Sequence, residues 1–198
     1  TVPSGATVMF DTLSHEGLLE DQGRNPLQYF ASKGIPANQV LKDAVVITQS
    51  DLPHDFAKDG PHIVTGPVAI QGAEPGDVLK IDILAVTPRV PYGVISNRHG
   101  KGALPGEFPE GAKPEADASA ADPSKFHNVS VFTPIRRTAR GQWEGVLKNQ
   151  RGAEVTFPTA PFMGVMGVAA DTNELVHSVP PGVFGGNMDV KDLGAGTT

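Results

Sequence analysis

A carboxamide and a carboxylate near the carboxyl end of the chain are the side chains best suited to chemistry. Asn187 and Asp189 stand two residues apart, directly after Gly185 and Gly186. Side chains two apart on a strand point to the same side of a sheet, and glycines let a substrate or a metal ion approach the main chain. The pattern predicts the rim of a site with Asp189 as the best metal ligand, although a glycine-rich turn with polar ends is the commoner meaning of such a stretch.

The six histidines are scattered along the chain, so their spacing alone predicts no metal centre. His15 follows a strand predicted over residues 7–13, and small polar residues at a strand end often face a cleft. The alternative is a satisfied loop in which the neighbouring Glu16 is solvated. His62 precedes an alternating apolar stretch, where a histidine is more often a packing or hydrogen-bonding residue than a ligand.

A basic loop rich in glycine covers residues 97–102. Main-chain amides in such a loop can hold an anion, although the sequence of a nucleotide-binding P-loop is missing. Arg98 and His99 are candidates to polarise a carbonyl group or to hold a carboxylate product. The alternative is an exposed loop whose charges are solvated.

The elements that must position these residues are predicted to be short. The chain contains 23 glycines and 18 prolines, which favours many turns and few long helices. Asn25 before Pro26 predicts a helix start, and a second short helix is predicted after Pro36, although residues 45–48 fit a strand equally well. Residues 107–124, rich in Pro, Ala, Gly and acidic residues, predict a flexible loop. Further strands are predicted over residues 68–71, 78–86, 129–136, 143–147 and 154–157.

Composition excludes several classes of protein. The net charge of −6 is spread along the chain, which argues against nucleic acid or an anionic membrane as a partner. No run approaches the roughly 18 apolar residues of a membrane span. The sequence contains no cysteine, so it offers neither a disulfide nor a thiol nucleophile.

Several blocks of sequence, in one order, resemble the acetamidase/formamidase family and together cover most of the chain. They are SHEGLLEDQGRNP, GPHIVTGPVAIQGAEPGDVLKIDIL, PRVPYGVISNRHGKGALPGE, PFMGVMGVA, SVPPG and GGNMD. The resemblance implies a mainly β fold of sandwich or barrel type with two short helices. It also implies hydrolysis of a short amide, such as formamide or acetamide, to a carboxylate and ammonia.

From residue type and position we predict that Asn187, Asp189 and His99 act in catalysis and that His15, His62 and Arg98 bind the substrate. The resemblance strengthens this prediction for His15 and His62, because both lie in matching blocks. Related members bind a divalent metal, zinc or alternatively calcium, with Asp189 as the ligand offered here. Because the sequence lacks GxSxG, attack by a metal-activated water is the mechanism that it contradicts least. The family continues with a block containing His and Glu that is absent here. Residues 1–198 are therefore expected to be one N-terminal and central portion of such a domain, with the site completed by other residues.

Two alternatives to an enzyme remain open: a non-catalytic β-sandwich that binds a ligand, and a purely structural domain. An incomplete sandwich would leave an open sheet edge, so the expected partners are further copies in a homo-oligomer or a second polypeptide completing the fold. No signal peptide is visible, which favours a cytoplasmic location over a secreted or periplasmic one.

Overall fold

The computed structural model describes residues 1–198, except that only the backbone is described for Phe56 and Ala57. The chain divides into two compact units. The first unit comprises Thr1–Ser14, Ala57–Arg89 and Ala160–Thr198, and the second comprises His15–Phe56 and Val90–Thr159.

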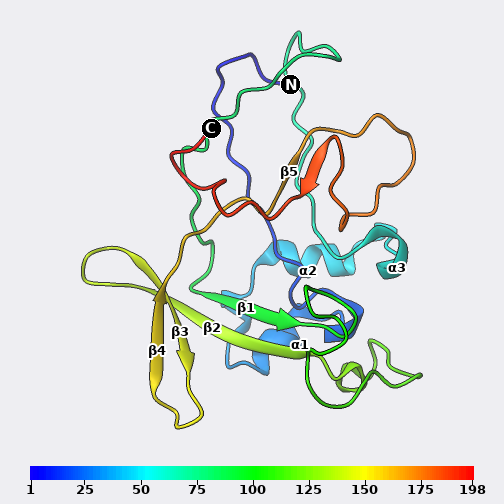
Figure 1. The fold of residues 1–198 in the computed structure, drawn as a ribbon, viewed down its shortest axis with the longest axis vertical. Coiled ribbons are helices and arrows are strands. Elements are labelled where there is room, and N and C mark those ends of the chain that lie inside the picture. Colours follow the sequence, from blue (N-terminus) through cyan, green and yellow to red (C-terminus); the bar gives the residue numbers. More distant parts are fainter. The chain divides into compact units, whose positions relative to one another are not determined.

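The second unit is built on a four-stranded antiparallel sheet (Figure 1). Its strands pair in sequence order: β1 (Tyr92–Asn97), β2 (Val129–Arg137), β3 (Trp143–Lys148) and β4 (Glu154–Pro158). β1 pairs with the first part of β2, whereas β3 pairs with its last three residues. The hairpin of β3 and β4 therefore extends beyond β1 (Figure 1). The strands predicted over residues 129–136, 143–147 and 154–157 are confirmed as β2, β3 and β4.

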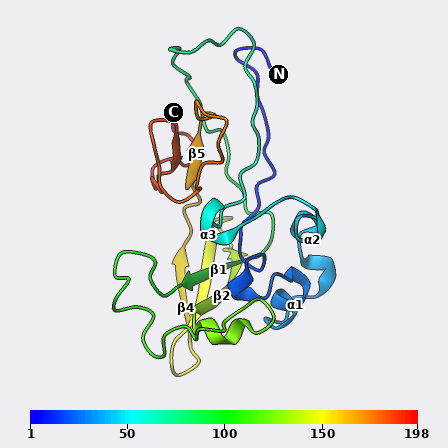
Figure 2. The same cartoon turned by 90° about the vertical axis from the view of Figure 1, so that its right-hand side faces the viewer.

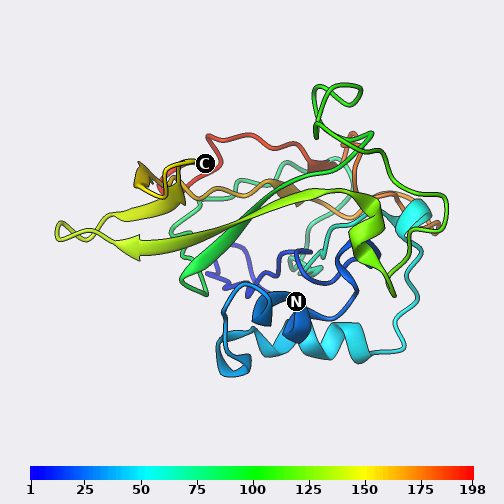
Figure 3. The ribbon, with the colours of Figure 1, turned by 90° about the horizontal axis from the view of Figure 1, so that it is seen from below.

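Two short helices cover one face of this sheet (Figures 2 and 3). They are α1 (Pro26–Ala31) and α2 (Lys42–Gln49), and they follow the two predicted helix starts. The side chain of Asn25 caps α1 by accepting the backbone N–H of Gln28 over 3.1 Å. Residues 45–48, for which a strand was the alternative, belong to α2. The short 3₁₀ turns of this unit are η1 (Glu20–Gln22), η2 (Ala37–Gln39) and η3 (Pro123–Phe126).

Aromatic side chains join the helices to the sheet. Phe30 of α1, Val40 and Tyr92 of β1 form the buried centre of the cluster. The ring centroids of Phe30 and Tyr92 lie 5.1 Å apart, and Phe132 of β2 packs 5.5 Å from Tyr92. The Tyr92 hydroxyl donates to the main-chain oxygen of Gln39 over 3.0 Å, which satisfies its polar end inside the cluster.

The first unit contains little regular structure. A two-stranded antiparallel sheet joins β5 (Val165–Gly167) to β6 (Gly185–Asn187), and Figure 1 labels β5. Isolated bridges join Val2 to Ile70 and Phe162 to Gly194. A four-residue helix, α3 (Phe56–Asp59), lies at the boundary between the two units in the sequence.

Three predicted strands are corrected by the structure. Residues 7–13, 68–71 and 78–86 form no ladder, apart from the single bridge at Ile70. In the last stretch, Ile83 alone exchanges main-chain hydrogen bonds, with Gly196 and Thr197. An alternating pattern predicts which side chains share a face, but a strand also requires a paired neighbour.

The mainly β class with two short helices is nevertheless confirmed. The predicted loop, residues 107–124, contains turns and one isolated bridge, from Ser119 to Asp122, and its last two residues begin η3. Within the described part of the chain, the helices are all too short or too polar to cross a membrane.

Candidate functional site

The carboxylate of Glu16 is the centre of a buried polar network in the second unit. Ser96 Oγ donates to Oε1 of Glu16 over 2.7 Å, and Arg98 Nη1 donates to the same oxygen over 3.3 Å. The side-chain amide of Gln22 donates to Oε2, while its oxygen accepts the N–H of Gly17 over 2.6 Å. Glu16 is only 8% exposed, so the alternative in which it is solvated is excluded.

Electrostatic interactions keep Glu16 and Arg98 in their charged forms. Burial by itself raises the pKa of Glu16. Hydrogen bonds with His15 and Ser96 and the charge of Arg98 outweigh burial and lower this pKa to about 2. Burial lowers the pKa of Arg98, but the carboxylates of Glu16 and Asp21 outweigh it and raise that pKa overall. The network therefore contains ionised groups at neutral pH.

Asp21 links the network to the loop that contains His99. Its Oδ2 accepts hydrogen bonds from Arg98 Nε over 2.6 Å and from the Asn128 amide over 3.0 Å. Asn128 Oδ1 accepts the N–H of His99 over 3.3 Å, and the His99 ring Nε2 lies 3.2 Å from the main-chain oxygen of His127. Among the described residues, three atoms here are buried without a hydrogen-bond partner: Asp21 Oδ1, Arg98 Nη2 and His99 Nδ1.

His15 contacts the same carboxylate. Its Nε2 lies 3.3 Å from Glu16 Oε1, and its side chain is 22% exposed. An ionised carboxylate can only accept a hydrogen bond, so Nε2 is the nitrogen that donates in this contact when the ring is neutral. The structure thus brings His15 and Arg98, both predicted to bind substrate, to one carboxylate. Their role in substrate binding stays a prediction.

Asn187 and Asp189 lie in the first unit. Asn187 ends β6 opposite Val165, and its side-chain amide donates to the main-chain oxygen of Val179 over 3.1 Å. Asp189 lies beyond the strand and has a left-handed backbone, with φ of 49°. The argument that a strand points both side chains the same way is therefore wrong, because the strand ends between them. Their catalytic assignment stays a prediction.

A glycine makes room for the Asp189 carboxylate. The N–H of Asp189 donates to the main-chain oxygen of Gly164 over 3.0 Å. A Cβ atom added to Gly164 would lie 2.8 Å from Asp189 Oδ1, closer than real Cβ contacts allow. The glycine before β5 is thus needed for this position of the carboxylate, which is a close approach of the kind that glycine in an apolar run predicts.

His62 pairs with a serine that the sequence did not single out. Its ring Nδ1 lies 3.0 Å from Ser178 Oγ, and its backbone N–H donates to the same oxygen over 3.2 Å. The N–H of Ser178 in turn donates to the main-chain oxygen of Asp59 over 2.9 Å. Ser178 precedes Val179, whose main-chain oxygen accepts the Asn187 amide, so these contacts join three separate segments of the first unit.

The described residues do not fit a zinc site. Zinc usually takes four ligands, with at least three from protein at a catalytic centre. Within the part of the chain that the structure describes, no group of three or more His, Asp or Glu side chains is arranged to hold a metal ion. Asp189 therefore has no set of co-ligands here.

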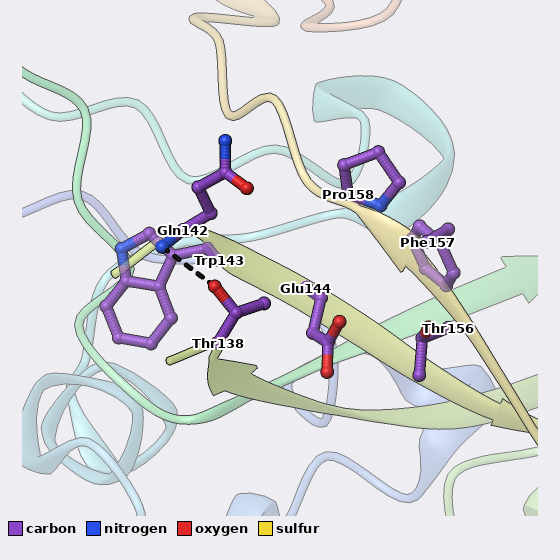
Figure 4. A pocket seen from close by; sticks show the side chains of 7 residues that line it. All are labelled: Thr138, Gln142, Trp143, Glu144, Thr156, Phe157 and Pro158. Atoms are coloured by element: carbon purple, nitrogen blue, oxygen red, sulfur yellow. Dashed lines mark hydrogen bonds between the residues drawn. The ribbon is translucent and has the colours of Figure 1, made fainter. Parts of the chain in front are cut away.

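A small hollow of about 230 Å³ lies at the beginning of β3 in the second unit (Figure 4). Arg137 stacks on the Trp143 ring at 4.5 Å, and Glu144 is paired with Arg136 at 2.8 Å. None of the predicted site residues lines this hollow. Its lining consists of Thr138, Gln142, Trp143, Glu144, Thr156, Phe157 and Pro158.

Sequence reasoning missed the partners that hold the predicted residues. Glu16 and Ser96 are 80 positions apart, and His62 and Ser178 are 116 positions apart. No local spacing indicates such pairs. The available signal was that each partner belongs to a block that resembles the family: Glu16 to SHEG and Ser178 to SVPPG.

Comparison with known proteins relates the chain to amidases. The model of the acetamidase/formamidase family matches residues 45–178. A formamidase of Methylophilus methylotrophus is 26% identical over 174 residues, covering 69% of this chain and 40% of the relative. An acetamidase of Mycolicibacterium smegmatis is 26% identical over 175 residues, covering 69% of this chain and 42% of the relative. No solved structure matches the chain.

The chain spans about 40% of the length of each relative that it matches. The family match nevertheless extends over more than half of the chain, from the middle of α2 to Ser178. It includes the basic loop of Arg98 and both members of the His62–Ser178 pair. The chain therefore belongs to the acetamidase/formamidase family.

Proposed function

We propose that the full-length protein hydrolyses a short-chain amide, such as formamide or acetamide, to a carboxylate and ammonia. The observation that carries this proposal is the family match over residues 45–178. The names of the two relatives, a formamidase and an acetamidase, support the same substrate class.

Amide hydrolysis requires an activated nucleophile, stabilisation of the charge on the carbonyl oxygen, and a proton for the leaving ammonia. These 198 residues contain no cysteine, so they supply no thiolate nucleophile. In our proposal the nucleophile is water. The chain contributes groups that take up protons, hold the amide and orient it.

His15 is proposed to bind the substrate from its position beside the Glu16 carboxylate. Glu16, with its pKa lowered to about 2, remains an acceptor for Nε2–H at any pH at which the ring is neutral. A carboxylate that holds one imidazole nitrogen in this way orients the ring. Arg98 would hold the carboxylate product, and His99 would take part from the neighbouring loop.

Asp189 and Asn187 are proposed to act in catalysis from the end of β6. The left-handed backbone of Asp189 and the missing side chain of Gly164 together give the carboxylate its position. Asn187 uses its amide nitrogen for Val179, so its carbonyl oxygen is the end proposed to accept a hydrogen bond from the amide nitrogen of the substrate.

A divalent metal, zinc or alternatively calcium, stays a separate part of this proposal. Asp189 would supply one ligand. Since the described residues hold no complete set, the other ligands would come from further polypeptide. Such an ion would supply Lewis-acid activation of water.

The test is ammonia release from formamide and acetamide by the full-length protein, before and after treatment with a chelator. We expect release from at least one of the two amides, a loss of most activity with the chelator, and recovery when zinc is added back. Amide binding without release would favour the non-catalytic alternative. Activity unchanged by the chelator would refute the metal and leave hydrolysis standing.

We also propose that further polypeptide, either other copies or a second chain, covers apolar side chains of the first unit. Met9 is 88% exposed, Leu175 is 82% exposed and Val78 is 93% exposed. In our proposal these side chains belong to the surface that the further polypeptide covers. We expect a native mass well above the 20.7 kDa of this chain. Light scattering that gives a stable, soluble 20.7 kDa species would contradict this expectation.

A further inference from the structure

The pairing of His62 with Ser178 bears on which nitrogen of the imidazole is protonated. The two residues belong to separate segments of the first unit, one after α3 and the other between β5 and β6. Ser178 Oγ contacts His62 twice: its distance to the backbone nitrogen is 3.2 Å and its distance to ring Nδ1 is 3.0 Å. Both side chains are half-buried, so the contact is partly shielded from solvent.

The backbone contact has only one possible direction. An N–H group donates, so Ser178 Oγ is the acceptor from the backbone of His62. The hydroxyl still has its own proton to donate. Among the described residues, the only acceptor within hydrogen-bond distance of this hydroxyl is His62 Nδ1. His62 Nδ1 is thus the acceptor that the described residues offer to the hydroxyl proton.

We infer that Ser178 holds His62 in the tautomer that is protonated on Nε2, so that His62 is a hydrogen-bond donor at its outer nitrogen. A neutral imidazole has one donor nitrogen and one acceptor nitrogen, and a hydrogen bond to one of them determines the role of the other. Nε2–H then suits an oxygen acceptor, such as the carbonyl oxygen of a primary amide. Ser178 is a positioning residue that acts through His62. This role for the donor rests on the proposed amide hydrolysis, whereas the tautomer does not.

The packing around Ser178 limits where its hydroxyl can lie. Gly60 is buried and has a left-handed backbone, with φ of 78°. A Cβ atom added to Gly60 would overlap Ser178 Oγ and would lie 3.0 Å from the Cε1 atom of His177. The N–H of Ser178 is fixed by the main-chain oxygen of Asp59. The hydroxyl is thus held against His62 by the backbone on one side and a glycine on the other.

Nitrogen NMR of the imidazole rings in the full-length protein tests this inference. The histidines are labelled with ¹⁵N, and long-range proton–nitrogen correlations identify the protonated nitrogen of each neutral ring. The signals of His62 are assigned by their loss in His62→Gln. Spectra are recorded about two pH units above the ordinary histidine pKa of about 6.5. We expect His62 to be almost entirely protonated on Nε2.

Two substitutions distinguish the effect of the Ser178 hydroxyl on the tautomer from the effect of the rest of the side chain. In Ser178→Ala the ratio of the Nε2–H to the Nδ1–H form should fall about fivefold, as expected for the loss of one hydrogen bond. Ser178→Thr keeps the hydroxyl and should restore the native ratio. Protonation of Nδ1 in the native protein would overturn the inference, and so would an unchanged ratio in Ser178→Ala. If Ser178→Ala does not fold, the native protein and Ser178→Thr still test the inference, because both are expected to be protonated on Nε2 of His62.

Activity provides the second readout. If His62 donates to the carbonyl oxygen of the amide, kcat/KM for ammonia release should fall about fivefold in Ser178→Ala and recover in Ser178→Thr. The expected tautomer without any ammonia release would refute the proposed function and leave the inference about Ser178 standing. Ammonia release with His62 protonated on Nδ1 would support the proposed function and refute the inference about Ser178.

Discussion

Replacing Asp189 by asparagine is expected to reduce ammonia release by the full-length protein about 10³-fold, with the fold unchanged. The size of the effect is that of losing one charged group that acts directly on the reacting atoms. Asparagine has nearly the same shape as aspartate and tolerates the left-handed backbone found here, with φ of 49°. The substitution therefore removes the negative charge without adding backbone strain.

The matched control is Asp192→Asn, three residues further along the same segment. The side chain of Asp192 is 76% exposed, and its ion pair with Lys191 is exposed as well. Removing such a charge costs little, so this variant should retain nearly native kcat/KM. Circular dichroism and melting temperature of both variants show whether the fold is kept.

Gly164→Ala tests the same carboxylate without changing it chemically. The added Cβ atom would lie 2.8 Å from Asp189 Oδ1, so the carboxylate has to move away. A displacement of about 1 Å at a reacting group costs about 10²-fold in rate, and that is the expected loss. Gly106→Ala is the control, because a Cβ atom there meets nothing within 4 Å. Near-native turnover by Asp189→Asn would refute the catalytic assignment, whatever Gly164→Ala does.

Local signals in the sequence predicted the elements whose contacts are themselves local. Asn25 caps α1 by a hydrogen bond to a residue only three positions away. The dipeptide Asn–Pro is typical of such a helix start, so it predicts the cap from the local sequence. β3 and β4 are joined by a short turn, and the aromatic and β-branched residues within each of them suffice to predict a strand.

Contacts between distant positions could not be predicted in the same way. Residues 78–86 have the alternation of a strand, yet the structure pairs only Ile83, and it does so with residues more than 100 positions away. The burial of Glu16 depends on Ser96 and Arg98, which only the fold brings to it. The same reason explains why Ser178 could not be recognised beside His62. Residue type and spacing identified plausible functional groups, while their partners followed from tertiary structure.

Replacing Glu16 by glutamine is expected to lower the free energy of unfolding at pH 7 by about 3 kcal/mol or more. Breaking a buried ion pair costs about 3–5 kcal/mol, and the lower end of this range applies here because Arg98 keeps its pair with Asp21. The side chain of Glu16 is 9% exposed and that of Arg98 is 14% exposed, so solvent screens the pair weakly. Among the described residues, Asp21 is the carboxylate that would still contact Arg98.

The control is Glu154→Gln, which removes a carboxylate from an exposed ion pair. The side chain of Glu154 is 52% exposed, and it pairs with Arg136 at 3.1 Å. Exposed pairs contribute about 0.2–1 kcal/mol, so this variant should unfold at nearly the native urea concentration. If Glu16→Gln also lowered the free energy of unfolding by only about 0.2–1 kcal/mol, the network around Glu16 would contribute little to stability.

The dependence of stability on pH separates the charge of Glu16 from its packing. The pKa of Glu16 is about 2 in the folded protein, against 4.5 for the ordinary side chain. A carboxyl group whose pKa is lowered by folding stabilises the protein above its unfolded pKa. This stabilisation, about 3 kcal/mol for such a difference, is lost as the pH falls through the folded pKa. The gap in unfolding free energy between the native protein and Glu16→Gln should therefore be full above pH 5 and should narrow steadily toward pH 2.

Urea unfolding at pH 7, 5, 4 and 3 measures this gap. Glu154→Gln is measured at the same pH values as the control for an exposed ion pair. A gap between the native protein and Glu16→Gln that stays constant from pH 7 to pH 3 would show that glutamine destabilises by altered hydrogen bonding alone. In that case the low pKa of Glu16 would not contribute to folding, and the proposal that an ionised Glu16 orients His15 would lose its physical basis.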